Sequence, residues 1–384
     1  MDSKKAFWIF AALTILMMVS DRLLFVIFPN YLLDKKFTAT EIGLIFSAAS
    51  FILLISRIFI GKISDMYGRK LIMSLGLFIQ SVSVFFYPFI SKIYEFSIVK
   101  GLYETSDTLT TSVKDAMIAD IFKKGVREKV IRKLGNAYVW GRGLAVLIGF
   151  LITIYFYSSF GFYAASFALF LSFILFTVFI KEPKIKIRKT GAKTSIKKYP
   201  FAFKMITMIG FMQTLLYAMS YYPGFFILAR KLNITENILF LILLTTYASG
   251  GVIIFLTRKW IDRIDKMKLS LISLMVFSVL IMLYPLSTSI LQFFLILFFV
   301  HLFFIYFWIA FKVVLLNSAV RKFRGEQIGF QKTMEGIGNL IGPLVGGFLI
   351  DAVSLQSVFF LAGGIGLVAT ISGYFLNKRL SSNF

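Results

Sequence analysis

Two carboxylates stand one helical turn apart in residues 94–117, the most polar of the helix-length stretches of the chain. Glu104 and Asp107 are i, i+3 neighbours on a helix. Two carboxylates that share a low-dielectric site resist ionising together, so we expect one of them to exchange a proton near neutral pH. Lys100 and Lys114 fall on the same helical line as Asp107. The alternative is therefore a static ladder of ion pairs.

Other ionisable residues lie at comparable depth in apolar stretches. Asp21 and Arg22 are adjacent and point about 100° apart on a helix, so we expect one to line a cavity and the other to reach a neighbouring helix. His301 is the single histidine, and its ordinary titration range suits either a proton carrier or a neutral packing residue. The candidate proton-carrying residues are Asp21, Glu104, Asp107 and His301.

A second set of side chains could contact a solute. Arg142 could bind an anion, clamp Asp21 or Glu104, or serve only the structure. Gln213, Tyr217 and Ser220 form a mild polar stripe, for which ordinary interhelical hydrogen bonding is the alternative. The candidate cavity residues are Arg22, Lys100, Arg142, Gln213, Tyr217 and Trp308.

The composition places these residues in a membrane. Hydrophobic residues make up 58% of the 384 and charged residues 16%, against about 25% charged in soluble domains; the mean hydropathy is +0.84. Most Lys and Arg lie at the termini or in every second loop, which follows the positive-inside rule. We therefore expect both termini in the cytoplasm, a place in the plasma membrane, and no nucleic-acid partner. Cysteine is absent, and we expect no metal, no cofactor and no enzymatic activity.

The apolar stretches are long enough to cross a bilayer, which takes about 20 residues each. We expect an all-α polytopic membrane protein with two six-helix bundles, 1–180 and 201–384, joined by a basic cytoplasmic linker, 181–200. The twelve expected spans are 7–32, 41–60, 71–90, 94–117, 131–155, 161–180, 201–222, 237–257, 269–286, 290–316, 328–350 and 355–376.

The two halves match each other at one offset. Shifting the sequence by 197 residues places Tyr87-Pro88 on Tyr284-Pro285 and Asp65 on Asp262. The same shift aligns three further pairs, which are Arg127 with Arg324, Gly141 with Gly338, and Gly149 with Gly346. A duplicated six-helix unit explains these matches, and parallel repeats of this kind describe one class of secondary transporter.

Two motifs resemble those of a known family. Gly61-Lys-Ile-Ser-Asp65-Met-Tyr-Gly68-Arg69-Lys70 resembles the G-x-x-x-D-[RK]-x-G-R-[RK] signature of the major facilitator superfamily, apart from Met66. In this motif we expect the two glycines to form a tight turn and Arg69 to bridge a carboxylate or a helix end. Lys114-Asp115-Ala-Met-Ile-Ala-Asp120, followed by Arg127, resembles a second motif of some members.

The resemblance implies a gate on the cytoplasmic side. Its candidate residues are Gly61, Asp65, Gly68, Arg69, Asp115, Lys312, Arg127, Asp262 and Arg324. The segment Gly338-x-x-x-Gly342-Pro343-x-x-Gly346-Gly347 resembles a glycine-proline bend that exporters carry in their fifth span. Because it lies in the eleventh span of this chain, we expect these five residues to serve helix packing.

Residues and resemblance together predict a secondary transporter. It would move a small organic solute by alternating access, coupled to protons, as a monomer in the lipid bilayer. Import and export stay open. The alternatives are an uncoupled facilitator or exchanger, and a receptor that does not transport.

Overall fold

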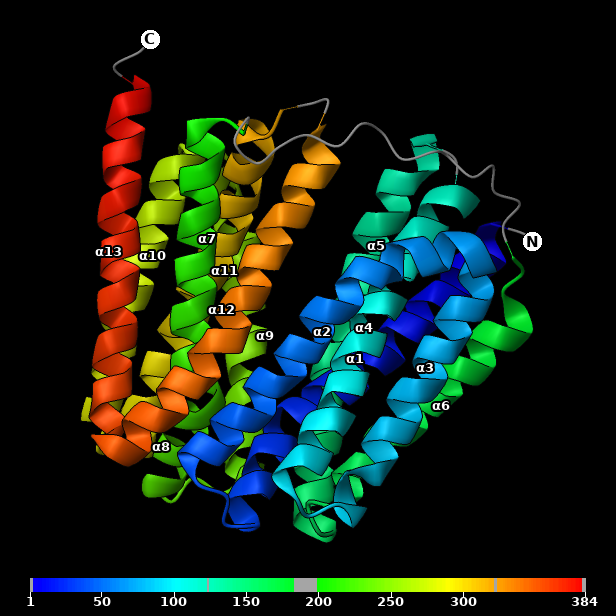
Figure 1. Ribbon diagram of the computed structural model, residues 1–384, viewed down its shortest axis with the longest axis horizontal. Helices are drawn as coiled ribbons and strands as arrows, with labels where there is room; N and C mark the ends of the chain where they lie inside the picture. The colour runs from blue at the N-terminus through cyan, green and yellow to red at the C-terminus, as the bar shows by residue number, and fades with distance from the viewer. Residues whose placement is uncertain (1–2, 123, 183–198, 321–322, 382–384) are drawn as a thin grey trace. The chain divides into compact units, whose positions relative to one another are not determined.

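The computed structural model describes residues 3–122, 124–182, 199–320 and 323–381 (Figure 1). Each element in these ranges is helical. The helices are α1 (Ser3–Asp34), α2 (Ala39–Tyr67), α3 (Arg69–Phe86), η1 (Tyr87–Phe89), α4 (Ile93–Ile121), α5 (Lys124–Tyr155), α6 (Phe160–Phe179), α7 (Phe201–Met219), η3 (Ser220–Phe225), α8 (Phe226–Lys231), α9 (Glu236–Arg263), α10 (Lys266–Leu283), η4 (Tyr284–Leu286), α11 (Ile290–Ser318), α12 (Arg324–Ala352) and α13 (Leu355–Ser381).

These helices account for the twelve predicted spans. Eleven segments of the described chain are long and apolar enough to cross a membrane, and one of them runs through α7, η3 and α8 together. The twelfth is α4, whose 29 residues give enough length but carry the charges discussed above. The prediction of an all-helical membrane fold is confirmed.

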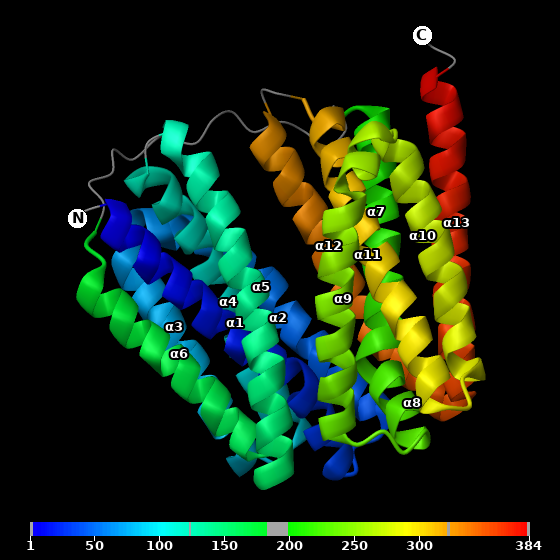
Figure 2. The same cartoon turned by 180° about the vertical axis from the view of Figure 1, so that it is seen from behind.

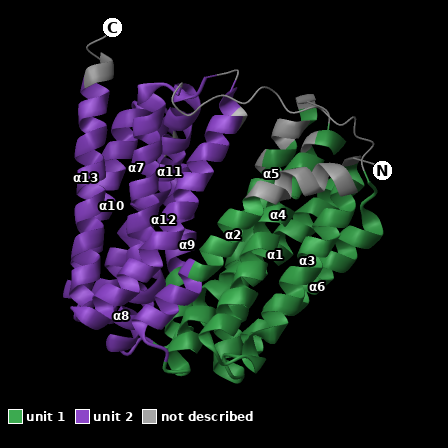
Figure 3. Ribbon diagram, in the orientation of Figure 1, with its two compact units in different colours: residues 1–36, 48–189, 235–244 green, residues 37–47, 190–234, 245–384 purple. Residues whose placement is uncertain are grey.

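The chain forms two compact units (Figure 3). Unit 1 comprises residues 1–36, 48–189 and 235–244, and unit 2 comprises residues 37–47, 190–234 and 245–384. In unit 1, α1 packs on α5 and α6, and α3 packs on α4 and α6 (Figure 2). In unit 2, α7 packs on α12 and α13, and α10 packs on α11 and α13. The predicted division at the linker 181–200 stays a prediction.

The duplication read from the sequence recurs in the element bounds. The starts of α3 and α10, of η1 and η4, and of α4 and α11 are each 197 residues apart. A buried tyrosine begins each short 3₁₀ helix, and three phenylalanine rings surround it. Tyr87 contacts Phe28, Phe96 and Phe162; Tyr284 contacts Phe225, Phe293 and Phe359. Each of these two sets, one tyrosine with its three phenylalanines, forms an aromatic quartet. Every residue of the first quartet corresponds to one of the second at the same offset, so each half contains its own copy of the same aromatic core.

The turn between α2 and α3 differs from the expected one. Helix α2 continues to Tyr67, so Gly61 lies within the helix and Gly68 alone makes the turn. Gly68 has φ +89°, and a Cβ there would meet the Glu182 carboxylate at 3.4 Å. Glu182 accepts hydrogen bonds from the backbone N–H groups of Arg69 (2.9 Å) and Lys70 (2.7 Å). The first turn of α3 is thus capped from the end of α6.

Unit 2 contains close helix contacts at the predicted glycines. A Cβ at Gly342 would lie 2.8 Å from the Cβ of Ala218, and one at Gly346 would clash with the backbone of Met219. A Cβ at Gly338 would lie 3.0 Å from the backbone nitrogen of Leu215. Glycine thus lets α7 and α12 approach backbone to backbone. A further close contact joins α12 to α2, because the backbone carbonyl of Pro343 lies against Gly43.

Candidate functional site

The acidic cluster of unit 1, defined as Asp21, Glu104 and Asp107, brings together the carboxylates of α1 and α4. Lys100 donates to Glu104 over 2.6 Å. Arg22 donates from Nε to Asp21 over 2.8 Å, a direct contact that their divergence by about 100° on the helix did not lead us to expect. The long guanidinium arm folds back along the helix and reaches the preceding carboxylate.

Asp107 has a different kind of partner. The side-chain amide of Gln80 on α3 donates to its Oδ1 over 3.1 Å, and Asp107 makes no ion pair within the described residues. The charges of Asp21, Glu104 and Lys114 act on Asp107 from a greater distance. It is therefore the one member of the acidic cluster whose direct partner is neutral.

Gln80 is fully buried, and only one half of its amide is used. Its Oε1 has no hydrogen-bond partner in the described part of the chain. A protonated Asp107 carries an O–H donor that its charged form lacks, and this free acceptor could receive it. The Gln80 amide thus offers its N–H₂ group to the charged form of Asp107 and its Oε1 to the protonated form.

Two other cations of unit 1 lie on α4 and α5. Arg142 donates to the hydroxyl of Tyr138 over 2.7 Å, and its guanidinium stands 4.4 Å from the centre of that ring. Lys114 forms no ion pair within 4.0 Å in the described ranges. The complete ladder of ion pairs considered from the sequence is therefore reduced to the Lys100–Glu104 pair.

The corresponding surface of unit 2 is aromatic. Tyr217 on α7 stacks on Tyr221 with 4.8 Å between ring centres and on Phe304 of α11 with 5.0 Å. Tyr222 stacks on Phe46 at 4.5 Å. Tyr221 and Tyr222 lie in η3, a π-helical segment that contains Pro223, and such segments occur often at functional sites. We name Tyr217, Tyr221, Tyr222 and Phe304 the aromatic cluster.

The other predicted residues of unit 2 lie on α7 and α11. His301 packs against the ring of Tyr247 at 4.8 Å. Trp308 contacts Phe304, and the ammonium of Lys332 lies 5.9 Å from its ring. Gln213 is 1% exposed, and neither amide atom has a hydrogen-bond partner in the described residues.

The predicted gate residues are only partly brought together. Arg69 forms an ion pair with Asp120, which links the two sequence motifs within unit 1. Asp115, Lys312 and Asp262 are exposed, and Arg324 begins α12. Gly61, Asp65 and Arg127 lie outside the residues whose side chains are described.

Three features were not found from the sequence. Gln80 is uncharged, so the pattern of ionisable groups does not point to it, although a lone amide in an apolar span is itself a signal. The cap from Glu182 joins residues far apart in the chain. The π-helix carries the local signal Pro223-Gly224, but the stacking of its tyrosines depends on Phe46 of α2 and Tyr217 of α7.

The chain belongs to the Major Facilitator Superfamily, whose family model matches residues 10–243 and 207–383. An uncharacterized MFS-type transporter of Methanocaldococcus jannaschii, MJ1560, is 25% identical over 356 residues, covering 89% of this chain and 90% of the relative. Multidrug resistance protein 1 of Bacillus subtilis is 26% identical over 375 residues, covering 90% of each. The fold resembles a crystal structure of a mutant of the nucleoside transporter NupG with TM-score 0.81 at 13% identity, over 96% of this chain and 99% of that one. The protein is thus a multi-pass membrane transporter.

Proposed function

We propose that the protein is a proton-coupled secondary active transporter of a small organic solute. It would work by rocker-switch alternating access in the plasma membrane, with both termini in the cytoplasm. The charge asymmetry of the loops supports this orientation. The carboxylates on α1 and α4 support the coupling, because ionisable groups at membrane depth are costly and mark proton or substrate pathways.

The observation that carries the coupling is the partner of Asp107. A carboxylate bound to a lysine or arginine leaves an unpaired cation behind when it takes up a proton, which is costly away from water. Asp107 is bound by the neutral Gln80 amide, so its protonation leaves no such charge. Asp107 is therefore the proton carrier we assign, with Asp21 and Glu104 acting on it electrostatically.

The aromatic cluster supports a solute with a flat apolar part. Stacked rings offer large contact area at a low cost in side-chain entropy. The name of one similar protein, multidrug resistance protein 1 of Bacillus subtilis, supports an organic solute. We assign solute contact to Tyr217 and Trp308 and leave the direction of transport to experiment.

The test uses the full chain reconstituted in liposomes with an imposed pH gradient. Lipophilic cations, nucleosides, amino acids, sugars and organic acids are screened for accumulation. With an accumulated solute in hand, Asp107→Asn should lose accumulation against a gradient and keep solute exchange. The double variant Glu104→Gln with Asp107→Asn should behave in the same way. Unaltered accumulation in the double variant would refute the coupling role of α4.

One observation favours an uncoupled facilitator or exchanger instead. Two of the three carboxylates in the acidic cluster already hold a cation within 3 Å, through Lys100 and Arg22. If all three carboxylates served only to balance charge, the parent chain would let solute equilibrate across the liposome membrane, and an imposed pH gradient would not drive its accumulation. Binding without any flux would identify a receptor.

A further inference from the structure

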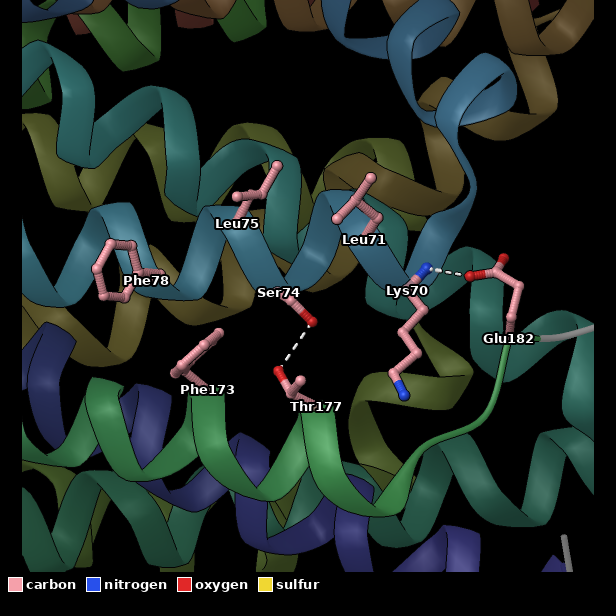
Figure 4. Close-up of a pocket in the computed structure, with 8 residues that line it drawn as sticks. All are labelled: Lys70, Leu71, Ser74, Leu75, Phe78, Phe173, Thr177 and Glu182. Carbon is pink, nitrogen blue, oxygen red and sulfur yellow. Dashed lines mark hydrogen bonds between the residues drawn. The ribbon is translucent and has the colours of Figure 1, made fainter.

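A groove runs between α3 and α6 in unit 1, apart from the acidic cluster (Figure 4). Its volume of about 490 Å³ lies in the range of ordinary ligand pockets, about 300–1,000 Å³. Its apolar wall consists mainly of Leu71, Leu75 and Phe78 on α3 and Phe173 on α6. The three α3 side chains are 51%, 47% and 42% exposed, so the groove is open along an apolar outer face of α3.

Among the polar groups that line the groove, the Lys70 ammonium lacks a direct partner in the described part of the chain. The hydroxyls of Ser74 and Thr177 bind each other over 3.0 Å. Both oxygens of Glu182 accept backbone N–H groups at the start of α3, where the helix dipole favours a negative charge. The ammonium of Lys70 forms no hydrogen bond or ion pair within the described residues. At one end of an apolar groove, a lysine ammonium without a direct partner therefore lies near a carboxylate whose oxygens are already held by backbone N–H groups.

The second half does not keep this arrangement. The residue 197 positions after Lys70 is Met267, and the residue after Ser74 at the same offset is Leu271. Leu271 lies where a Cβ on Gly373 of α13 would clash with it, so the equivalent position between α10 and α13 is filled. The groove and its charge are thus particular to the first half of the repeat.

We propose that this groove is a binding site for an anionic phospholipid of the leaflet that contacts the basic loops. One acyl chain lies along Leu71, Leu75, Phe78 and Phe173, and the phosphate meets the Lys70 ammonium. Charge complementarity selects the headgroup, because anionic lipids attract basic residues next to a span. The apolar wall selects a lipid over a free anion, because inorganic phosphate has nothing to place against it.

Native mass spectrometry of the full chain in detergent tests the site without any transported solute. The probes are phosphatidylglycerol and phosphatidylcholine with identical acyl chains. The parent chain should hold phosphatidylglycerol more tightly. Lys70→Met, which copies the residue of the second half, should weaken that binding about fivefold and leave phosphatidylcholine unchanged. The matched control is Lys268→Met, an exposed lysine in the first turn of α10, and it should change neither.

A second variant separates the groove from the charge. Ser74→Leu, which copies Leu271, should reduce binding of both lipids because it fills the groove, and its melting temperature in detergent alone checks that it folds. Equal phosphatidylglycerol binding by Lys70→Met and the parent would overturn the proposal. Displacement of the lipid by inorganic phosphate would also overturn it and indicate a free-anion site instead.

Discussion

At the scale of single residues, three similar carboxylates acquire different partners. Asp21 and Glu104 each hold a cation from their own helix, whereas Asp107 is reached by an amide from α3. Sequence spacing predicts neighbours on one helix, so the Lys100–Glu104 pair follows from it. The partner of Asp107 depends on the packing of α3 against α4, which spacing on α4 alone does not contain.

Gln80 should set the pH range over which transport operates. In Gln80→Leu, the Asp107 carboxylate loses the donor that stabilises its charged form, so the pH of half-maximal transport should move upward. The measurement is the initial rate of solute uptake by proteoliposomes across a pH series. Gln292→Leu, which alters an exposed amide at the start of α11, is the control and should leave the profile in place. An unshifted profile in Gln80→Leu would remove Gln80 from the coupling pair.

At the scale of elements, glycine decides how closely helices approach. The sequence predicts packing surfaces from the glycine spacing in α12, but not which backbone meets each glycine. Gly68 shows the same thing. The motif predicts a turn there, but it does not predict that Glu182, which follows α6, caps the first turn of α3. Local patterns therefore predict where a helix bends or ends, while its partners are set by the fold.

Gly346→Ala should separate α7 from α12 and destabilise the protein. The new methyl group would meet the Met219 backbone, which cannot move as a flexible side chain does. We expect a loss of about 1–3 kcal/mol in the free energy of unfolding, measured by chemical unfolding in detergent. Gly329→Ala on the same helix has no atom within 4 Å of its Cβ and should be neutral or stabilising by up to about 1 kcal/mol. Equal effects of the two substitutions would contradict a packing role for Gly346.

At the scale of the whole molecule, the fold is two copies of one six-helix unit with different chemistry. The offset of 197 residues, read from a few matches, extends to helix starts and to the two aromatic quartets. The copies diverge where function is expected, since one carries the acidic cluster and the other the aromatic cluster. Repeat and topology follow from hydropathy and spacing, but this division between the copies emerges only from side-chain contacts.

The shared aromatic cores predict matching responses in the two halves. The hydroxyls of Tyr87 and Tyr284 are buried without a hydrogen-bond partner in the described chain, which costs free energy in each half. Tyr87→Phe and Tyr284→Phe should therefore each raise the stability by about 1 kcal/mol, measured as the melting temperature in detergent. A gain in one half with a loss in the other would show that the two cores are not equivalent.

At the level of the transport cycle, solute and proton should cross together, with Asp107 carrying the proton. The most direct measurement is the pH inside proteoliposomes, followed with a trapped pH-sensitive dye, when a transported solute is added without a pH gradient. The parent chain should move protons when the solute is added, and Asp107→Asn should move solute without protons. Proton movement of equal size in both would contradict the account.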